Sequence, residues 1–597
     1  MSKAVKQAFS PVTGLHSGLS LTGRSWVWRS EPDDRTERLA LALAQKKNLS
    51  DFLAGLMTRR GVTPETADLF LDPTLRTLMP DPFSLKDMDK AAERLVSAIR
   101  AGETVGIFGD YDVDGACSAA LLAGFLQRSG CRVLTHIPDR LTEGYGPNPI
   151  AMDALAEQGA GLIVCVDCGT SAADIFARME HAPDIVVIDH HVTEGPPPPV
   201  HATVNPQRGD CESGLRTLCA AALTWLVMAA TMKLMENDRR PLLDDLDLVA
   251  LATVCDVMPL TGTNRAFVTQ GLKIMGQRRR TGLRSLMDAA GVNGQPTAFS
   301  CGYALGPRVN AGGRIGDAGL GAKMLLSSDE EETGTIARQL TSLNRTRQEV
   351  EQDTLSEALK AAEAQIAAGH AVVLTASAAW HPGIVGIIAG RIKEKFNRPA
   401  LVAATDENGI LKGSGRSIPG CDIGRAVIAA REYGILLTGG GHMMAAGFGL
   451  EQDRLSEFHA FMNERLAAAC EAPAAPPLMI DAVLPLSAAT EACTRDMAAM
   501  EPFGAGNEEP VLILQNVRVV RYDRIGKDGN TIRVILGDQG TGTLKALMFR
   551  VQDSPALPVL EDRQRPLLHV AGCLRMESWN GRESLSFFIS DVALAGS

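Results

Sequence analysis

Short, mostly apolar runs alternate with helical segments over the first half of the chain. Glycine- and aspartate-rich turns follow several of these runs, and a helical segment of small residues fills positions 116–129. Strands that are apolar along most of their length are typical of parallel sheets, because helices cover both faces. The alternation therefore predicts a doubly wound α/β domain over residues 71–325. Its expected strands lie at 104–108, 132–137, 162–166 and 185–188.

The pattern changes at about residue 328. From there to residue 368 the chain is rich in Glu, Gln, Ala, Arg and Leu, a composition that predicts one or two long helices. We expect a connecting helix over 326–368. A second α/β unit over 369–470 then begins with a predicted strand at 371–375.

The two ends of the chain have patterns of their own. Residues 471–477 (EAPAAPP) have the composition of a linker. After them, strand-like runs separated by turn residues predict a small barrel of the OB type over 478–597. Residues 1–70 predict a small helical lead-in, anchored by Trp26 and Trp28. The runs of the barrel lie at 511–514, 517–520, 531–536, 543–549, 567–574 and 584–588.

Length and composition narrow the class of protein. At 597 residues the chain is too long for one hydrophobic core, so three or four domains are expected. Hydrophobic content of 45% and charged content of 22% are those of an ordinary soluble protein. The sequence has no apolar stretch long enough to span a bilayer and no signal-peptide pattern at its N-terminus. We therefore expect a cytoplasmic protein without a membrane partner.

The net charge of −11, with an isoelectric point near 5.6, argues against a protein that coats nucleic acid through bulk positive charge. A nucleic-acid enzyme with this balance has to concentrate its positive charge in a groove. Part of the negative charge can belong to metal-binding carboxylates.

The 12 cysteines are scattered along the chain. Cys165 and Cys168 form a CxxC pair around Asp167, but the sequence has no second CxxC that would complete a zinc site. We expect reduced cysteines that pack as small hydrophobic residues. The alternative is a redox pair, which an exposed position of the two thiols would favour.

Three aspartates follow the first predicted strand at alternate positions, in the segment 109–115 (GDYDVDG). Like charges as close as those of Asp110, Asp112 and Asp114 repel one another, and a divalent cation would neutralise them. The alternative is an Asp-rich turn that caps the next helix. Taken alone, the segment favours neither.

Two further strand ends carry groups that can bind metals. Asp167 follows the run at 162–166, and Asp189, His190 and His191 follow the run at 185–188. Ligands of open parallel sheets bind at the carboxyl ends of the strands. We expect Asp256, at the end of an apolar helix, to join them; the alternative for it is a solvated helix end.

Carboxylates combined with imidazoles favour Mn²⁺ or Mg²⁺ over structural zinc, which prefers thiolates. Five or six ligands are too many for one tetrahedral ion. Two ions about 4 Å apart can hold a bridging hydroxide and clamp both oxygens of a phosphoryl displacement. The pattern therefore predicts a two-metal phosphodiesterase site.

Several segments resemble known motifs. Four of them resemble, in order, the signature motifs of the DHH phosphoesterases: 109–115 (GDYDVDG), 166–169 (VDCG), 189–191 (DHH) and 252–257 (ATVCDV). Downstream blocks are similar to those of the RecJ family of exonucleases: 306–314 (GPRVNAGGR), 380–383 (WHPG), 413–420 (GSGRSIPG), 439–447 (GGGHMMAAG) and 502–507 (PFGAGN). The resemblance covers roughly residues 70–595 and implies a DHH catalytic domain followed by a DHHA1-like domain.

The resemblance also implies roles for the residues at the strand ends. Asp110 and His191 are expected beside the metals or facing the phosphate, and Asp189 is expected to orient the neighbouring imidazole. The implied metal ligands are Asp112, Asp114, Asp167, His190 and Asp256.

Glycine-rich blocks with arginine suit phosphate binding, because glycines let backbone amides approach an anion and arginine binds it bidentately. We expect Arg140, Tyr145 and Arg308 to hold the terminal nucleotide or its 5′ phosphate. The alternative for each arginine is a surface ion pair. Further candidates for DNA binding are Asn310, Arg314, Ser414, Gly415, Arg416, Ser417, Gly441 and His442. With 5% aromatic residues, base stacking along an extended groove is not evident, so a narrow entry is expected to select single strands.

The resemblance implies an exonuclease that degrades single-stranded DNA from 5′ to 3′ into mononucleotides, in DNA repair and recombination. Two Mn²⁺ or Mg²⁺ ions are its expected cofactors. A helicase and a single-strand-binding protein are its expected partners, and a monomer is its expected state. One alternative is a phosphohydrolase of short oligonucleotides or cyclic dinucleotides. Another is a non-catalytic scaffold, which would lack ligand residues that this sequence retains.

Overall fold

The computed structural model describes residues 19–140, 142–179, 183–192, 195–406, 409–470, 475–526, 529–538, 540, 542–552, 554–579 and 582–595. The chain divides into two compact units. The central unit comprises Leu78–Pro473 and Gly504–Gly506, and the terminal unit comprises the other described residues.

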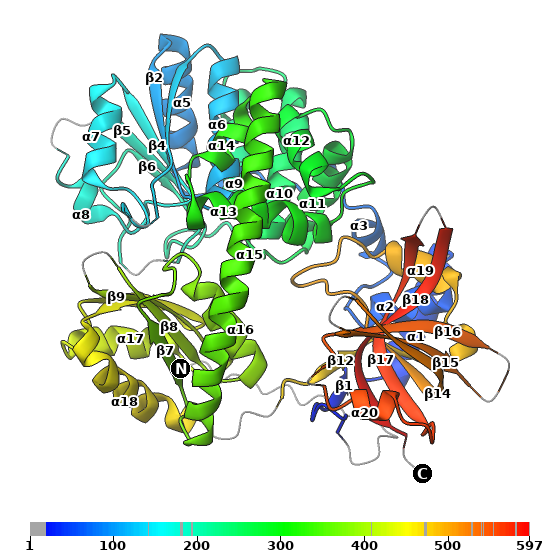
Figure 1. The fold of residues 1–597 in the computed structure, drawn as a ribbon. Helices are drawn as coiled ribbons and strands as arrows, with labels where there is room; N and C mark the ends of the chain where they lie inside the picture. The colour runs from blue at the N-terminus through cyan, green and yellow to red at the C-terminus, as the bar shows by residue number, and fades with distance from the viewer. Residues whose placement is uncertain are drawn as a thin grey trace. The chain divides into compact units, whose positions relative to one another are not determined.

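The first sheet of the central unit is parallel throughout, in the order β3-β2-β4-β5-β6. Helices lie on both of its faces, as apolar strands require (Figure 1). The predicted doubly wound sheet is therefore confirmed. Its strands are β2 (Thr104–Gly109), β3 (Arg132–His136), β4 (Leu162–Val166), β5 (Asp184–Ile188) and β6 (Ala202–Val204). The helices around it are α5 (Met88–Ala101), α6 (Val113–Arg128), α7 (Pro149–Glu157), α8 (Ala173–Phe176) and α9 (Ala220–Leu234).

A helical region follows this sheet in the chain. Its α10 is apolar except for Asp247 and Thr253 and is buried apart from its end, because it packs against α6, α9 and α11. The elements of this region are η1 (Pro82–Ser84), η2 (Arg240–Asp245), α10 (Leu246–Cys255), α11 (Gly262–Gly276), α12 (Thr281–Ala290), η3 (Ser300–Leu305), α13 (Gly306–Ile315) and α14 (Leu320–Leu326).

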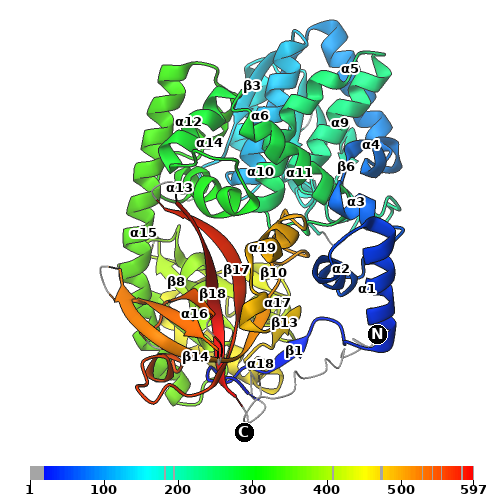
Figure 2. The same cartoon turned by 90° about the vertical axis from the view of Figure 1, so that its right-hand side faces the viewer.

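A single helix, α15 (Glu330–Ala367), connects the two α/β parts of the central unit (Figures 1 and 2). Asp329 caps it by accepting a hydrogen bond from the backbone N–H of Glu332. Its first half packs on α12, α13 and α14, and its second half packs on α16 and β7. One helix therefore stands where one or two were expected, because no proline interrupts the segment.

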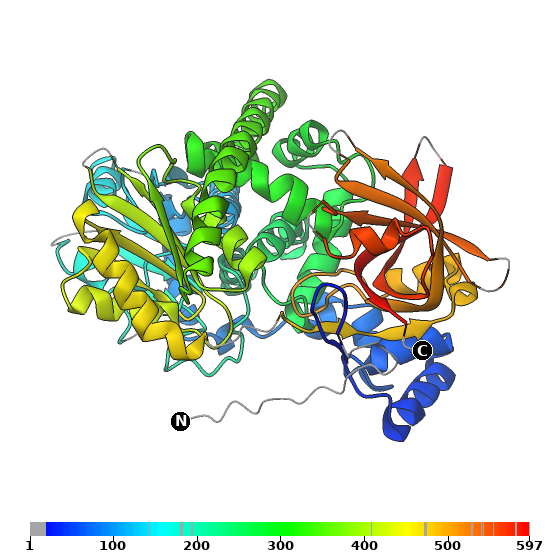
Figure 3. The ribbon, with the colours of Figure 1, turned by 60° about the horizontal axis from the view of Figure 1, so that its bottom comes forward.

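The second sheet of the central unit is mixed, in the order β10-β11-β9-β8-β7, with β7 and β8 parallel and the other pairs antiparallel. Helices α17 and α18 pack on one face, and α15 and α16 pack on the other (Figure 3). The predicted second α/β fold is confirmed. Its elements are β7 (Val373–Ser377), α16 (Val385–Phe396), β8 (Ala400–Thr405), β9 (Leu411–Arg416), α17 (Ile423–Glu432), β10 (Thr438–His442), β11 (Ala445–Leu450), η4 (Gln452–Arg454), α18 (Leu455–Leu466) and η5 (Ala467–Ala469).

The terminal unit contains a six-stranded sheet in the order β13-β14-β15-β16-β18-β17. The pairing of β14 with β17 closes it into a barrel, as predicted for an OB-type domain. Its elements are β12 (Leu478–Ile480), β13 (Ala482–Leu484), η6 (Leu486–Ala488), α19 (Glu491–Ala498), β14 (Leu512–Ile525), β15 (Thr531–Gly537), β16 (Thr543–Phe549), α20 (Leu557–Leu560), β17 (Leu568–Trp579) and β18 (Arg582–Leu594).

The two strands predicted at 511–514 and 517–520 are one strand, β14, and this part of the prediction is wrong. The pairing of β14 with β17 shifts register between Leu514 and Val517, and Asn516 between them has φ of 55°. An irregularity of this kind leaves a polar residue within a continuous strand, and such a residue looks like a turn in the sequence.

The N-terminal segment belongs to the terminal unit. Its short strand β1 (Trp26–Trp28) pairs in parallel with β12. The side chain of Trp26 is fully buried, and its indole N–H donates a hydrogen bond of 3.0 Å to Asp591. The helices of the segment are α1 (Asp34–Lys47), α2 (Asp51–Thr58), α3 (Ala67–Leu71) and α4 (Leu75–Leu78), and the chain passes from one unit to the other at the end of α4.

Two expectations from composition can be compared with the structure. Among the described residues, none of the helices has the length and apolar character needed to cross a membrane. Cys165 and Cys168 are both fully buried, which fits packed thiols and does not favour a redox pair.

Candidate metal centre

The aspartate-rich loop after β2 turns sharply into α6. Oδ1 of Asp112 caps this helix by accepting hydrogen bonds from the backbone N–H of Asp114 (2.8 Å) and of Gly115 (3.1 Å). A Cβ atom at Gly115 would lie 2.3 Å from the carbonyl oxygen of Asp110, so only glycine permits the turn. The capping alternative therefore holds for one oxygen of Asp112, and the loop still brings three carboxylates together.

Asp114 is almost fully buried under the N-terminus of α9. The backbone N–H groups of Ala220 and Ala221 donate hydrogen bonds to its two oxygens, at 2.7 and 2.8 Å. Burial nevertheless raises the pKa of Asp114 above its ordinary value. Sequence reasoning missed this support, because backbone amides at a helix start carry no side-chain signature.

Asp167 follows β4 in a left-handed conformation, with φ of 62°. Its side chain is buried, and its Oδ1 lies 3.2 Å from Nε2 of His190. Burial, and then the neighbouring Asp114, raise the pKa of Asp167 well above its usual range. The left-handed backbone of Asp167 is strained, and strain of this kind is typical of residues at functional sites.

His190 lies between carboxylates from three different elements. Besides Asp167, its Nε2 lies 3.7 Å from Asp114 and 3.6 Å from Asp256. Burial lowers the pKa of His190, which favours the neutral imidazole that metals bind. Asp256 caps the C-terminus of α10, and burial raises its pKa to about 8.

Asp189 is the centre of a hydrogen-bond network behind the site. It accepts bonds from the backbone and hydroxyl of Thr170 at 3.0 and 2.6 Å, and from the backbone N–H groups of His190 and His191 at 2.7 and 3.1 Å. Asn205, fully buried, donates to the Thr170 hydroxyl at 3.0 Å and to the His191 carbonyl at 3.0 Å. Sequence reasoning missed Thr170 and Asn205, because only the fold brings them beside Asp189.

His191 points its Nδ1 at Asp189, 2.7 Å away. Burial lowers the pKa of His191, but its hydrogen bond with Asp189 outweighs burial, and the net pKa is about 9. The same interaction lowers the pKa of Asp189 below its ordinary value despite burial. The hydroxyl of Tyr145 lies 3.1 Å from His191 Nδ1, so the structure brings this predicted residue to the site.

Three overlapping groups of ligand atoms meet at this edge of the sheet. They are Asp110, Asp112 and Asp167; Asp114, His190 and Asp256; and Asp167, His190 and His191, and the atoms of each group lie within 4.8 Å of one another. All five predicted ligands belong to these groups, and Asp110 and His191 join them.

The donor set fits divalent metal ions. Four buried atoms have no hydrogen-bond partner among the described residues. They are Oδ1 of Asp110, Oδ1 of Asp167, Nε2 of His190 and Oδ2 of Asp256. Buried polar atoms without partners are costly, and carboxylates that repel one another are more so. Oxygen and imidazole donors in this number suit Mn²⁺ or Mg²⁺.

Basic side chains gather beside the aspartate loop. The guanidinium of Arg140 lies over the ring of Tyr111, 5.1 Å from its centroid. Burial, and after it the charge of Arg140, lowers the pKa of Arg314 to about 10. The same two causes lower the pKa of Arg416. Arg347, on α15, adds to the effect on Arg314 and was not predicted. This arginine cluster is the local concentration of positive charge that the acidic composition requires of any protein that binds nucleic acid.

Glycines let the backbones around this cluster approach closely. A Cβ atom at Gly313 would lie 2.8 Å from the carbonyl oxygen of Tyr111, so α13 packs directly on the aspartate loop. A Cβ atom at Gly383 would lie 2.1 Å from the carbonyl oxygen of Arg314. The Arg314 guanidinium also donates to the Gly383 carbonyl at 3.2 Å. The second α/β part is thus fitted against the end of α13.

The 413–417 block serves two purposes. Ser414 and Arg416 lie beside Gly386 of α16, where an added Cβ atom would approach their Oγ and Nη2 atoms at 3.4 and 3.2 Å. Gly415 instead faces the core, where a Cβ atom would lie 2.6 Å from the side chain of Ile423. Ser417 is buried, and its hydroxyl donates to the carbonyl of Cys421 at 2.5 Å. The structure therefore brings Arg416 to the cluster and gives Gly415 and Ser417 packing contacts.

The other predicted DNA-binding residues lie in varied surroundings. Gly441 and His442 are exposed on β10. Arg308 donates to the Thr341 hydroxyl at 3.2 Å and to a carbonyl one turn earlier in the chain at 2.6 Å. Asn310 is half-buried on the same helix. Arg308 therefore ties α13 to α15, and the contacts that it makes here are structural.

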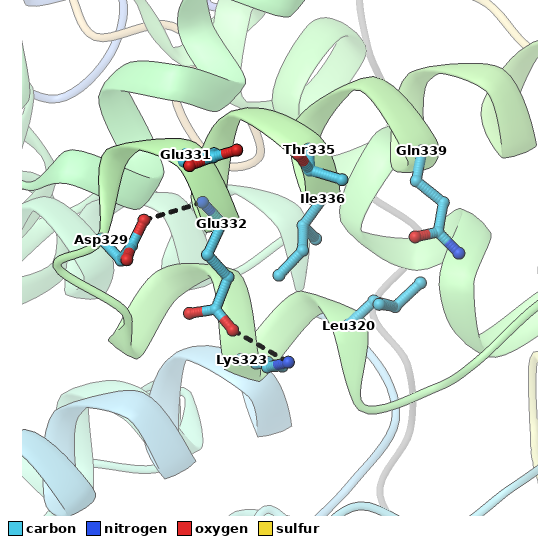
Figure 4. A pocket seen from close by; sticks show the side chains of 8 residues that line it. All are labelled: Leu320, Lys323, Asp329, Glu331, Glu332, Thr335, Ile336 and Gln339. Atoms are coloured by element: carbon cyan, nitrogen blue, oxygen red, sulfur yellow. Dashed lines mark hydrogen bonds and ion pairs between the residues drawn. The ribbon is translucent and has the colours of Figure 1, made fainter.

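A shallow pocket of about 480 Å³ lies between α14 and the start of α15 (Figure 4). Lys323 pairs there with Glu332 at 2.9 Å. The lining residues are Leu320, Lys323, Asp329, Glu331, Glu332, Thr335, Ile336 and Gln339. The pocket contains none of the predicted site residues, and its acidic lining suits neither DNA nor phosphate.

Family models match three parts of the chain. The DHH family N-terminal domain matches residues 104–253, the DHHA1 domain matches 368–468, and the RecJ OB domain matches 480–591. The order of the three matches is the order of the three folds in the structure.

Curated relatives match over most of the chain. The single-stranded-DNA-specific exonuclease RecJ of Bacillus subtilis is 31% identical over 559 residues, which cover 93% of this chain and 69% of that protein. The protein of the same name from Salmonella typhimurium is 32% identical over 591 residues, which cover 94% of this chain and 98% of that protein.

Solved structures agree with these relatives. The crystal structure of Thermus thermophilus RecJ in complex with Mn²⁺ has a TM-score of 0.78 at 27% identity, covering 95% of this chain and 79% of that one. Its complex with Mg²⁺ has a TM-score of 0.73 at 26% identity, covering 95% and 78%. From the ligands at the sheet edge and these similarities, the chain belongs to the RecJ family of single-stranded-DNA-specific exonucleases.

Proposed function

We propose that this protein hydrolyses single-stranded DNA from its 5′ end into mononucleotides, in DNA repair and recombination. The activity depends on two divalent ions, Mn²⁺ or Mg²⁺. The observation that carries the proposal is the convergence of four buried ligand atoms, from Asp110, Asp167, His190 and Asp256, that have no hydrogen-bond partner in the described part of the chain. Divalent cations would satisfy these atoms and neutralise the clustered carboxylates.

The ligand groups divide into two sets. Asp110 and Asp112 would hold one ion, and Asp114, His190 and Asp256 would hold the other. Asp167 forms one group with Asp110 and Asp112 and another with the two histidines, so it lies between the two sets. When bound, the ions supply an activated water and neutralise charge on the scissile phosphate. This assignment makes Asp110 a ligand, in addition to the five residues predicted from the sequence.

The protein's own groups orient these ligands and the substrate. Asp189 fixes both imidazoles through its hydrogen bonds, and Thr170 and Asn205 hold Asp189 in place. Tyr145 lies against His191 at the outer side of the network. Rigid support of this kind is what keeps metal ligands in a productive geometry.

The arginine cluster gives the enzyme its polarity. Arg140, Arg314 and Arg416 bind the 5′-terminal phosphate of the strand and present the next phosphodiester to the ligand groups. Two observations support this assignment. The charge of Arg140 repels those of Arg314 and Arg416, and a bound anion would relieve that repulsion; the hydroxyl of Ser414 also lies near Arg416. Binding of a terminal phosphate explains an exonuclease that starts at one end.

Digestion of single strands labelled at either end tests the proposal. A 5′ label should appear at once as a mononucleotide, and a 3′ label should stay on long products until late. Chelation of divalent ions should stop the release, and Mn²⁺ should restore it. Immediate release of the 3′ label would reverse the proposed polarity.

The main alternative is an enzyme for short oligonucleotides or cyclic dinucleotides. Turnover of a dinucleotide and of a long single strand, compared on the same preparation, separates the two. A strong preference for the dinucleotide would favour the alternative.

The setting of the activity is part of the proposal. A single-strand-specific enzyme needs a helicase to open duplex DNA and meets single-strand-binding protein on its substrate. The three ligand groups lie within one chain, so they need no second copy, and we propose a monomer. The proposed place of action is the cytoplasm.

A further inference from the structure

Two exposed aromatic rings lie together on the surface of the central unit. Phe299 and Tyr303 have 64% and 73% of their surface exposed, and their rings stack with centroids 4.6 Å apart and planes 24° apart. Aromatic residues make up 5% of the sequence, and large apolar side chains of this kind are usually buried. Exposed rings in a parallel pair therefore point to a partner that binds flat against them.

The element that carries the pair is unusual. Tyr303 lies within η3, a π-helix over Ser300–Leu305, and Phe299 directly precedes it. The wide turn of a π-helix is rare and is found mostly at functional sites. Here it presents two rings, four positions apart, on the same side.

This π-helix packs against the end of α10, next to the metal centre. The Cys255 thiol donates to the Cys301 carbonyl at 3.4 Å. A Cβ atom at Gly306 would lie 2.4 Å from Cys255 Sγ, so the two backbones are in close contact. Cys255 directly precedes Asp256, a member of the ligand groups. The ring pair is therefore attached to the segment that positions a metal ligand.

The residue after that ligand is also apolar and exposed. Val257 is 69% exposed and has φ of 57°. A β-branched residue in this conformation is strained, and such strain persists where the surrounding structure imposes it. An exposed apolar side chain thus lies directly beside Asp256, at the edge of the site.

We propose that Phe299 and Tyr303 form a stacking platform for a base of the single strand, on the 3′ side of the cleaved phosphodiester. The inference rests on the proposed function. A ring face binds any base, so the platform holds the strand without reading its sequence, as a general nuclease requires. The chain has too few aromatic residues to stack bases along an extended groove, and the platform stacks a base at one point instead.

A nucleobase fits this surface better than a protein partner does. A stable protein interface buries about 800 Å² on each side, and two rings are much smaller than that. A single base has about the area of one ring. The continuity with Asp256 also places the platform next to the strand that is cleaved.

The test replaces each ring by an aliphatic side chain. Tyr303→Leu and Phe299→Leu should raise KM for a long single strand about tenfold, the usual size of one base–aromatic stack. The value of kcat should stay near that of the unchanged protein, because the rings touch no reacting atom. Tyr303→Phe, which keeps the ring, should have the KM of the unchanged protein. Tyr433→Leu is the matched control, because Tyr433 is also 73% exposed but lies in the other α/β part.

Single abasic sites, moved stepwise along the strand, test the same point without relying on one variant. In the unchanged protein, KM should rise at one position on the 3′ side of the cleavage point, and Tyr303→Leu should lose this sensitivity. A flat profile in the unchanged protein, or the same profile in both proteins, overturns the platform. If the unchanged protein fails to degrade the intact strand, the proposed function itself is at fault.

Discussion

At the residue scale, the metal ligands depend on groups that have no catalytic signature of their own. The acidic residues and histidines could be predicted, because each follows an apolar strand or helix in the sequence. Their supports could not: Thr170, Asn205 and the backbone of Ala220 reach the site only through the fold. Likewise, the sequence marks Ser417 as a phosphate ligand, whereas in the structure its hydroxyl is buried against a carbonyl.

Replacement of Thr170 by valine tests the network behind the ligands. The change removes a hydroxyl that donates to Asp189 and accepts from Asn205, at nearly constant volume. Activity or Mn²⁺ affinity should fall about 10- to 100-fold, as when other groups that orient metal ligands are lost. Titration of Mn²⁺ against the hydrolysis rate measures both.

The matched control is Thr224→Val, which removes a buried hydroxyl that has no hydrogen-bond partner among the described residues. Its effect on activity should be small, and stability should stay the same or rise. Equal losses in the two variants would contradict an orienting role for Thr170.

Arg416→Ala tests the arginine cluster. Single-strand binding, measured in the presence of a chelator, should weaken, because a bidentate phosphate contact is lost. The slope of log Kd against log salt should fall by about 0.7, the value for one phosphate contact on a single strand. Arg425→Ala, which removes an exposed arginine of α17, is the control and should change neither quantity. An unchanged slope in Arg416→Ala would remove this residue from the interface.

At the scale of elements, the sequence predicted the strands well and their continuity poorly. Runs such as 162–166 are apolar because both faces are covered, so the pattern identifies them directly. The long strand β14 appeared as two strands, because an irregular pairing places Asn516 inside it. The π-helix η3 had no sequence signal, since its turn depends on packing against α10.

Close contact between elements gives a sharp prediction at Gly383. Gly383→Ala should force the second α/β part away from α13, because the new Cβ atom would lie 2.1 Å from the Arg314 carbonyl oxygen. Overpacking of this kind costs about 1–3 kcal/mol of unfolding free energy. The rate of hydrolysis should also fall more than about tenfold, since Arg314 is displaced. Chemical unfolding and end-label digestion measure the two effects.

Gly390→Ala is the control for that change. Gly390 lies inside α16, and a Cβ atom there would meet no atom within 4 Å. Alanine should raise the unfolding free energy by about 0.5–1 kcal/mol, because it has the higher helix propensity. Activity should stay unchanged. If Gly383→Ala behaved like Gly390→Ala, the close contact with α13 would not matter for the site.

At the scale of the whole molecule, charge is divided between two neighbouring regions. The net charge of −11 required a local concentration of positive charge, and the arginines beside the aspartate loop supply it. The sequence predicted the need for such a cluster and three of its members, Arg140, Arg314 and Arg416. It did not reveal Arg347, which lies on a helix that looked like a simple connector.

Metal binding should therefore stabilise the fold. Burial, and after it the charges of neighbouring carboxylates, raise the pKa values of Asp114, Asp167 and Asp256, and a bound cation would offset both effects. At a free Mn²⁺ concentration 100 times its Kd, each ion should add about 2.7 kcal/mol to the unfolding free energy. Thermal unfolding with Mn²⁺ and with chelator measures the gain. A Tm that does not respond to Mn²⁺ would contradict binding at the buried cluster.

The most direct test of the two-metal site is the rate at which Asp167→Asn releases mononucleotides from single-stranded DNA at saturating Mn²⁺. Asp167 belongs to two ligand groups, so its loss should affect both ions. The rate should fall more than about a hundredfold, while binding of the strand in chelator is retained. Asp174→Asn, an exposed change on α8, should leave the rate unaltered. Hydrolysis by Asp167→Asn at the normal rate would contradict the assignment of the metal centre.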